Sequence, residues 1–355
     1  MIPLPAPGND PRWRLAWFGA IAFVTLFGLA EFTSWLLGSI TGTSWWAEDL
    51  RLILDAGTRL AAGGNPYADP KFLYPPAAAV LGAALGPFDP FAVSIVYAVG
   101  KVALALACVA RLTRGWTAFP RTLAVLGVTC SLPFLHDLML GNANALLVAA
   151  AAVALFSADR PRSGVALGVV TALFAKPLLV PILLLLLVRR RRTFGGVLAG
   201  GLAVTAVSAL VAGPARYLDW VGALREGSRY AAPFAGNHGV TALFPDAWLP
   251  VAAMTGIGLL VVLWRGSWPT AVTWAVTSGI LLAPYAGTYA ALPIALAVPL
   301  IGPAEPLLAL LITGLSPVAT TYALPFFAGG ILLASLRLRG APRPGAGHPQ
   351  PPLPA

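Results

Sequence analysis

Charged residues are scarce in this sequence. Asp, Glu, Lys and Arg make up 10% of the 355 residues, whereas 58% are hydrophobic. A soluble globular domain carries roughly a quarter charged residues, so the composition argues against a water-soluble protein. Cysteine is nearly absent as well. Cys108 and Cys130 both lie in apolar segments, which argues against a structural disulfide and against a thiolate metal cluster.

Long apolar runs take up most of the chain instead. Trp13–Leu37, Val93–Ala110 and Phe194–Ala212 have the length of membrane helices, about 20 residues at a rise of ~1.5 Å each. Backbone polar groups in lipid must bond within the segment, so we predict that these runs are helices. The predicted class is an all-α polytopic membrane protein, a bundle of roughly 10–12 transmembrane helices. We place spans near 13–37, 91–112, 119–138, 143–158, 194–213, 247–264, 270–286, 289–301, 304–316 and 321–336.

Basic residues flank the ends of these spans. They are Arg12, Arg14, Arg111, Arg114, Arg121, Arg160, Arg162, Arg189 to Arg192, Arg265, Arg337, Arg339 and Arg343. The positive-inside rule then gives one alternating topology, with both termini in the cytoplasm and with loops 38–90 and 213–246 outside. Most acidic residues fall on that outer side. The net charge of +10 is therefore interpreted as a topology signal, and a nucleic-acid partner is not expected.

We predict one membrane domain, residues 1–338, and a Pro-rich tail, residues 339–355, that is disordered and cytoplasmic. The first span lacks a small-residue cleavage site after a short apolar core and is expected to be an uncleaved anchor. Residues 76–88 are apolar but too few to cross a bilayer. They are predicted to form an interfacial or re-entrant helix.

The segment 163–188 has the length of one span, yet one span would carry residues 189–192 to the same side as Asp137. That arrangement would oppose the positive-inside preference. We predict two short helices that turn at Lys176-Pro177, because proline cannot continue the helical hydrogen-bond ladder. The turn leaves Lys176 at membrane depth on the outer side, where ionisable groups are usually functional.

The first outer loop offers two candidate carboxylates. In a helix over residues 48–62, Asp55 lies four residues from both Arg51 and Arg59, so an ion-pair ladder explains it. No local cation explains Asp49, which is interpreted either as a helix N-cap or as a general base.

Other charges lie within apolar sequence. Glu31 and Lys101 are expected to sit near span ends or to pair inside the bundle. Asp137, beside His136, is interpreted as a solvated span terminus, with a second acid of the outer face as the alternative.

Several short motifs follow one another along residues 45–245. They are Asp49 with Ala56-Gly57, Gly63-Gly64-Asn65-Pro66-Tyr67 and Tyr74-Pro75-Pro76, then Gly141-Asn142-Ala143-Asn144, then Gly164 through Lys176-Pro177, and then Gly236-Asn237-His238-Gly239. In this order they resemble the motifs of glycosyltransferase family 87, a family of the GT-C superfamily of polyprenyl-phosphate-sugar-dependent enzymes. Each motif is weak alone, whereas the ordered set is fairly specific. Asn142 stands where the family usually has Gln, and His238-Gly239 stands where it has Gln-Ser.

The resemblance implies a GT-C-type membrane fold and an enzyme that transfers a sugar, expected to be mannose. The donor would be a polyprenyl-phosphate sugar and the acceptor a cell-envelope glycolipid or glycan on the outer face. The reaction would be inverting, with Asp49 as general base and His238 as a second catalytic group; an ordinary loop histidine is the alternative for His238.

The remaining site residues are assigned in the same way. The donor phosphate is assigned to Lys176, Arg225 and Arg229. Acceptor or sugar contacts are assigned to Asn65, Tyr67, Tyr74, Asn142, Asn144 and Asn237. Interfacial anchoring is the alternative for the two tyrosines. Neither a cofactor nor a metal is expected, and membrane lipid is the surrounding partner.

A transporter or flippase for lipid-linked saccharides is the alternative function, since it also needs an outer polar cavity. Transporters often carry internal repeats and polar groups on both sides of a midplane site. The polar groups here lie on one predicted side and no repeat is evident, so the enzyme is favoured. A scaffold without activity is a third interpretation, because some motif positions are altered.

Overall fold

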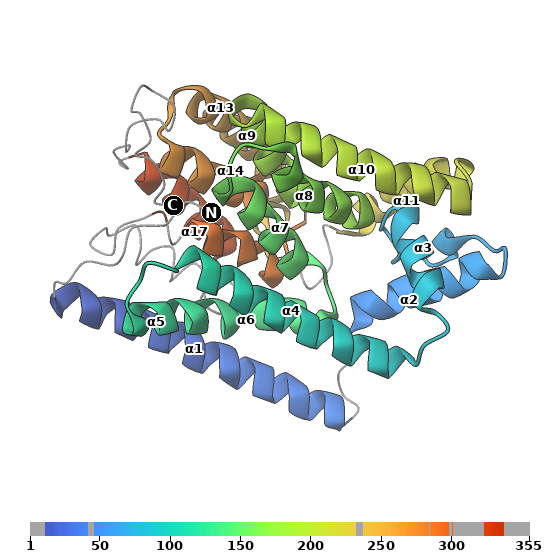
Figure 1. The fold of residues 1–355 in the computed structure, drawn as a ribbon, viewed down its shortest axis with the longest axis horizontal. Helices are drawn as coiled ribbons and strands as arrows, with labels where there is room; N and C mark the ends of the chain where they lie inside the picture. Colours follow the sequence, from blue (N-terminus) through green and yellow to red (C-terminus); the bar gives the residue numbers. More distant parts are fainter. Residues whose placement is uncertain are drawn as a thin grey trace, which may run out of the picture.

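The computed structural model describes residues 11–41, 46–231, 237–283, 285–297, 300 and 323–336. Every regular element in these ranges is a helix and none is a strand, which confirms the all-α class (Figure 1). The elements are α1 (Pro11–Ile40), α2 (Glu48–Ala61), η1 (Pro66–Ala68), α3 (Pro76–Leu85), α4 (Pro90–Leu112), α5 (Ala118–Thr129), α6 (Leu132–Leu140), α7 (Asn144–Phe156), α8 (Pro161–Phe174), η2 (Pro177–Leu179), α9 (Val180–Arg189), α10 (Arg191–Ala212), α11 (Ala215–Ala231), α12 (Val240–Leu243), η3 (Pro245–Ala247), α13 (Trp248–Arg265), α14 (Trp268–Leu282), η4 (Thr288–Leu296) and α17 (Leu324–Ser335).

Four described helices are long and apolar enough to cross a membrane: α1, α4, α10 and the helix that ends at Arg265. The pair α5–α6, bent by 46°, would make a fifth span. Several other apolar helices are shorter, so the expected count of 10–12 spans stays a prediction. The span expected at 289–301 is wrong: residues 288–296 form a 3-10 helix that contains Pro293. The predicted span 304–316 and the tail 339–355 lie outside the described residues.

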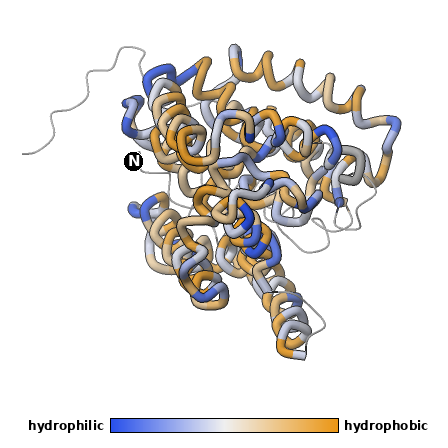
Figure 2. Tube along the Cα trace, turned by 90° about the vertical axis from the view of Figure 1, so that its right-hand side faces the viewer, coloured by the Kyte–Doolittle hydropathy of each residue, from blue (hydrophilic) through white to orange (hydrophobic). Residues whose placement is uncertain are grey.

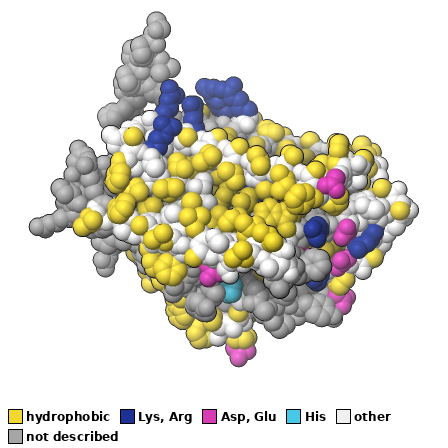
Figure 3. All heavy atoms as spheres, turned by 90° about the horizontal axis from the view of Figure 1, so that it is seen from below, with side chains coloured by type: hydrophobic (Ala, Val, Ile, Leu, Met, Phe, Trp, Pro, Cys, Tyr) yellow, Lys and Arg dark blue, Asp and Glu magenta, His cyan; other side chains and the backbone are white. Residues whose placement is uncertain are grey.

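The long helices expose apolar side chains to their surroundings. Only 17–22% of each spanning window is buried within the protein, and Leu210 on α10 is 85% exposed. Hydrophobic residues run along the helices, whereas hydrophilic residues concentrate at helix ends and turns (Figure 2). Figure 3 shows a belt of hydrophobic side chains, with a group of Lys and Arg side chains at the upper edge and acidic side chains together with further Lys and Arg at the right. This surface fits a lipid bilayer.

The predicted turn at Lys176-Pro177 is confirmed. Helix α8 ends at Phe174 and is followed by Ala175, whose backbone is left-handed (φ 39°), and η2 begins at Pro177. The chain then returns through α9, so that Arg190 donates to the carbonyl of Ser157 at the end of α7. Asp159 Oδ1 accepts from the backbone N–H of Thr193 over 2.9 Å at the start of α10. The arginine cluster 189–192 therefore lies at the same end of the molecule as the start of α8.

Glycines bring α2 and α3 into close contact. A Cβ on Gly57 would lie 2.1 Å from the backbone nitrogen of Ala83, and one on Gly82 would lie 2.0 Å from the carbonyl oxygen of Ile53. Helix α2 is amphipathic and buries its apolar face, including Leu50 and Ile53, against this partner. Small residues thus fix α2 at one end of the bundle, on the right in Figure 1.

The charged face of α2 differs from the expected ladder. Asp55 is exposed, and in the described part of the chain no ion pair joins it to Arg51 or Arg59. Arg59 instead lies 3.9 Å from the carboxylate of Asp69 in the following turn. The chain reverses direction after α2, and Asp69 thereby comes closer to Arg59 than Asp55, which lies on the same helix as Arg59.

Candidate active site

A cavity of about 600 Å³ opens beside α2. Its lining residues are Glu48, Asp49, Leu52, Pro70, Lys71, Leu73, Leu140, Glu226, Gly227, Tyr285 and Tyr289. Loops 38–90 and 213–246, which the sequence predicts to lie outside, both contribute residues to this lining. They are joined where Trp220 Nε1 donates to the carbonyl of Leu73 over 3.0 Å and Arg216 donates to the carbonyl of Gly64 over 3.4 Å.

Asp49 stands in the first turn of α2. The helix begins after Ala47, whose left-handed backbone carries no side-chain cap. The carboxylate of Asp49 accepts a hydrogen bond from the side-chain amide of Asn142, which lies 93 residues later in the sequence. The N-cap interpretation is therefore wrong, because this carboxylate bonds to another element and not to the first N–H groups of its own helix.

The surroundings of Asp49 favour proton uptake. Burial raises the pKa of its carboxyl above the ordinary value of 3.8 and outweighs the charge of Lys176 and the hydrogen bond from Asn142, which both lower it. The negative charges of Asp137 and Glu48 act in the same direction as burial. A carboxylate with a raised pKa is a better proton acceptor near neutral pH, so Asp49 has the properties of a general base.

Lys176 stands at the turn between α8 and η2, partly buried. Its Nζ lies 5.1 Å from the ring centroid of Tyr74 and 5.6 Å from that of Tyr289. No described carboxylate comes within ion-pair distance of it. Because Tyr289 lines the cavity, this ammonium lies behind one of its walls. An ammonium held between two rings, with no described carboxylate within ion-pair distance, is suited to bind an anion.

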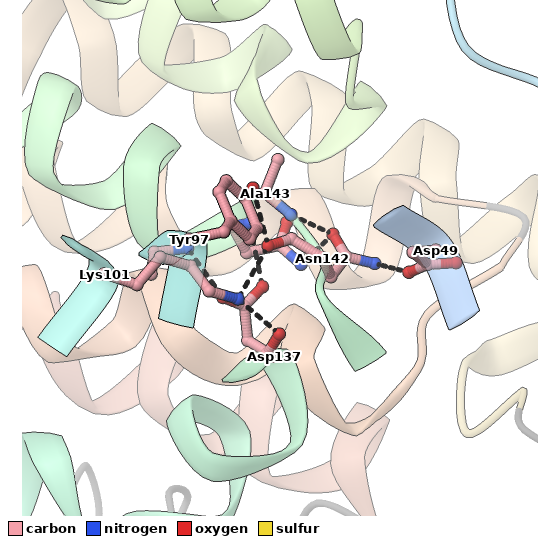
Figure 4. A network of polar contacts seen from close by, with 8 residues as sticks. Asp49, Tyr97, Lys101, Asp137, Asn142 and Ala143 are labelled. Carbon is pink, nitrogen blue, oxygen red and sulfur yellow. Dashed lines mark hydrogen bonds and ion pairs between the residues drawn. The ribbon is translucent and has the colours of Figure 1, made fainter. Parts of the chain in front are cut away.

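A buried polar network lies behind Asp49 (Figure 4). Lys101 and Asp137 form an ion pair of 3.2 Å, and both side chains are 0% exposed. Asn142 stands between this pair and Asp49, and Asn144 Nδ2 donates to Asn142 Oδ1 over 3.1 Å. The expectation that Lys101 pairs inside the bundle is confirmed. The interpretation of Asp137 as a solvated terminus is wrong, because it caps the buried start of α7 by accepting from the N–H of Asn144 over 2.8 Å.

One of the sequence-predicted residues supports the cavity from outside its lining. Asn237 is buried, and its Oδ1 accepts from the N–H groups of Gly239 and Ala286 over 2.9 and 3.1 Å. The N–H of His238 donates to the carbonyl of Ala286 over 2.8 Å. These bonds tie the second loop to the segment that carries Tyr285 and Tyr289.

Other predicted residues are not among those that line the cavity. The side chain of Asn65 is exposed and caps the start of η1, where it accepts a hydrogen bond from the N–H of Tyr67 over 3.0 Å. The hydroxyl of Tyr67 donates to the carbonyl of Tyr74 over 3.0 Å. Arg225 is exposed on α11 and is not among the lining residues, and the side chain of Arg229 lies outside the described part. Asn142 and Asn144 are buried behind Asp49 with their amides bonded within the protein.

Sequence reasoning missed several lining residues. Lys71 and Glu48 form an ion pair of 3.3 Å at the cavity. Tyr285 and Tyr289 also line the cavity, with their hydroxyls 3.5 Å apart. The sequence did contain a signal for these tyrosines. They stand four residues apart in an otherwise apolar stretch, where the predicted span 270–286 ends and the predicted span 289–301 begins.

A family model, Glycosyltransferase family 87, matches residues 72–284. This stretch exceeds half of the chain and runs from α3 through α14. It contains Lys101, Asp137, Asn142 and Lys176, whereas Asp49 precedes it. No curated protein and no solved structure matches the chain.

Proposed function

Because the chain belongs to glycosyltransferase family 87 and is a membrane-type glycosyltransferase, we propose that it transfers mannose from a polyprenyl-phosphate donor to a cell-envelope glycolipid or glycan. The observation that carries this proposal is the position of Asp49. It lines a cavity of about 600 Å³, it has a raised pKa, and the charge of Lys176 is close enough to act on it.

The proposed reaction is a single displacement. The acceptor hydroxyl gives its proton to the carboxylate of Asp49 as its oxygen attacks the anomeric carbon of the donor sugar. The bond between that carbon and the phosphate oxygen breaks, and polyprenyl phosphate leaves with the electron pair. Attack from the face opposite the phosphate inverts the anomeric centre.

The leaving phosphate gains negative charge, and we infer that Lys176 stabilises it. Its ammonium is held by the rings of Tyr74 and Tyr289 rather than by a carboxylate. Preorganised positive charge of this kind is effective because it needs no reorganisation during the reaction. His238, Arg225 and Arg229 remain further candidates for phosphate or acceptor contacts.

An apolar groove supports a lipid-linked donor. A hollow of about 350 Å³ lies between α8, α9 and α10, and its lining is almost entirely apolar, including Val180, Leu183 and Leu202. It begins beside the hairpin that carries Lys176. We assign the prenyl chain to this groove, since an isoprenoid requires an apolar surface next to the site that binds its phosphate.

The charge pattern supports an outer location for the site. Helix α7 begins at Asn144, next to Asn142 and Asp49, and ends near Ser157, which accepts from Arg190. The cavity and the arginine cluster therefore lie at opposite ends of α7. With the arginines in the cytoplasm, the cavity faces the outside. The transporter alternative loses weight because the family is one of glycosyltransferases.

The test uses the purified full chain in nanodiscs with radiolabelled polyprenyl-phosphate mannose and extracted envelope glycolipids. We expect labelled mannose on the acceptor and release of an equal amount of polyprenyl phosphate. Polyprenyl-phosphate glucose and a nucleotide-linked mannose serve as competing donors. Transfer from the nucleotide-linked sugar alone would overturn the lipid donor, and preferred transfer of glucose would overturn mannose.

A further inference from the structure

Lys101, Asp137 and Asn142 form a network that the proposed reaction does not itself use. We propose that this network is a positioning device, which holds the amide of Asn142 toward Asp49 and thereby fixes the orientation of the base. The inference rests on the proposed function, because it takes Asp49 as the base.

The hydrogen bonds of Asn142 leave its amide one orientation. Its Oδ1 accepts from the backbone N–H of Ala143 over 2.7 Å and from Asn144 Nδ2 over 3.1 Å. The oxygen must therefore face α7, and the NH2 group must face Asp49, to which it donates. A flipped amide would place a donor against the N–H of Ala143 and an acceptor against a carboxylate.

Lys101 and Asp137 hold the turn that carries this amide. The Nζ of Lys101 donates to the carbonyl of Asp137 over 2.6 Å, to its carboxylate over 3.2 Å and to the carbonyl of Asn142 over 2.9 Å. The Tyr97 hydroxyl donates to the same carbonyl of Asn142 over 3.1 Å. The carboxylate of Asp137 also accepts from the N–H of Ala145 over 3.2 Å. Both backbone flanks of Asn142 are thus fixed by charge-assisted bonds.

Gly141 adds a steric constraint to the same turn. Its backbone is left-handed (φ 66°), and an added Cβ would lie 2.9 Å from the Cβ of Leu50 and 3.1 Å from that of Ala47. The turn therefore packs directly against the start of α2, one residue from Asp49. Rigid contacts on both sides explain how a network behind the cavity acts on a group that lines it.

A purely structural role would not require this arrangement. A buried ion pair is a weak source of stability, and apolar residues of similar volume often replace it without loss. The Lys101–Asp137 pair is instead connected to the cavity residue Asp49 through the side-chain amide of Asn142. The charged and titratable groups that face Asp49 from the surrounding elements are Glu48, Asp137, Lys176, Lys101, Tyr74, Tyr97, Tyr285 and Tyr289.

Lys101→Met tests the proposal, because it keeps the length of the side chain and removes its donors. We expect kcat for transfer to fall by about 10- to 100-fold, the usual effect of a misplaced reacting group, with little change in donor KM. The acid limb of the pH profile should move to higher pH, because Asp49 loses the hydrogen bond that favours its ionised form. Asn142→Ala should give the same shift. Arg59→Met, which breaks a partly exposed ion pair with Asp69, is the matched control.

A second readout does not depend on transfer. The ionisation of Asp49 is followed by infrared difference spectroscopy of carboxyl groups, with Asp49→Asn as the reference that identifies its signal. An upward shift of this titration in Lys101→Met and Asn142→Ala supports the positioning role, even if the wild-type protein transfers no mannose and the proposed function fails. An unchanged titration together with unchanged kcat in folded variants overturns it. If Lys101→Met does not fold, Tyr97→Phe, which removes one bond to the turn, decides by the same shift.

Discussion

Replacing Asp49 with Asn removes a proton acceptor while it preserves the size of the side chain. Asn142 donates to one carboxylate oxygen of Asp49, and an amide oxygen at position 49 can accept the same bond. The packing of α2 depends on Leu50, Ile53 and Gly57, which the substitution leaves intact. We therefore expect Asp49→Asn to fold, to insert and to bind the donor.

The expected loss is one of rate. A positioned general base contributes about 10²–10⁴-fold to a reaction, which corresponds to about 2.7–5.5 kcal/mol of transition-state stabilisation. The assay is single-turnover transfer of labelled mannose in nanodiscs, with donor affinity measured separately by equilibrium binding.

Asp55→Asn is the matched control on the same helix. Asp55 is exposed and forms no described ion pair, so its replacement should change stability by less than about 0.5 kcal/mol and leave transfer near normal. Near-normal transfer by Asp49→Asn, with a large loss in Asp55→Asn, would identify the other carboxylate as the base. Near-normal transfer by both variants would refute the carboxylate mechanism.

The same geometry predicts the pH dependence and the behaviour of three other positions. Because burial raises the pKa of Asp49, its ionised form is lost as the pH falls, and kcat/KM should decline through an acid limb that lies above 3.8. Lys176→Met should lower kcat/KM for the donor by about 10- to 100-fold, since a hydrogen bond to a charged group is worth about 1.5–3 kcal/mol; unchanged kcat/KM would assign Lys176 a structural role. Gly141→Ala, at a left-handed backbone, should lower both Tm and transfer, whereas Gly115→Ala, with no atom within 4 Å of its Cβ, should not. In intact cells an impermeant thiol reagent should label Gly222→Cys on exposed α11 but not Arg191→Cys; the reverse pattern would invert the topology.

Local sequence signals predicted the fold well where the cause was local. The turn at Lys176 follows from Pro177 and from arginines that must return to one side, and both features stand within a short stretch of sequence. The same reasoning failed for residues 288–296, where an apolar composition was interpreted as a span although Pro293 interrupts it. Hydropathy alone does not distinguish a buried 3-10 segment from a crossing helix.

The candidate site was harder to predict because its contacts join distant parts of the chain. Asp49 stands out in the sequence as an acid without a local cation, but its bond to Asn142 spans 93 residues. Asp137 has the sequence position of a solvated span end, and its burial becomes tolerable through Lys101, 36 residues earlier, and through the backbone N–H groups of Asn144 and Ala145. Periodicity along one helix carries no information about such pairings.

The proposed base and the proposed phosphate-binding group belong to different structural elements. Asp49 depends on α2, which glycine contacts hold against α3, whereas Lys176 depends on a hairpin whose ends are fixed at the far side of the bundle. The family match begins at residue 72, so a chain cut there would keep Lys176 and the turn that carries Asn142 but would lose the proposed base. The proposed base and the proposed phosphate ligand thus come from segments far apart in the sequence, yet their supports meet, because Ile53 of α2, Tyr74 and Phe174 at the end of α8 pack into one buried cluster.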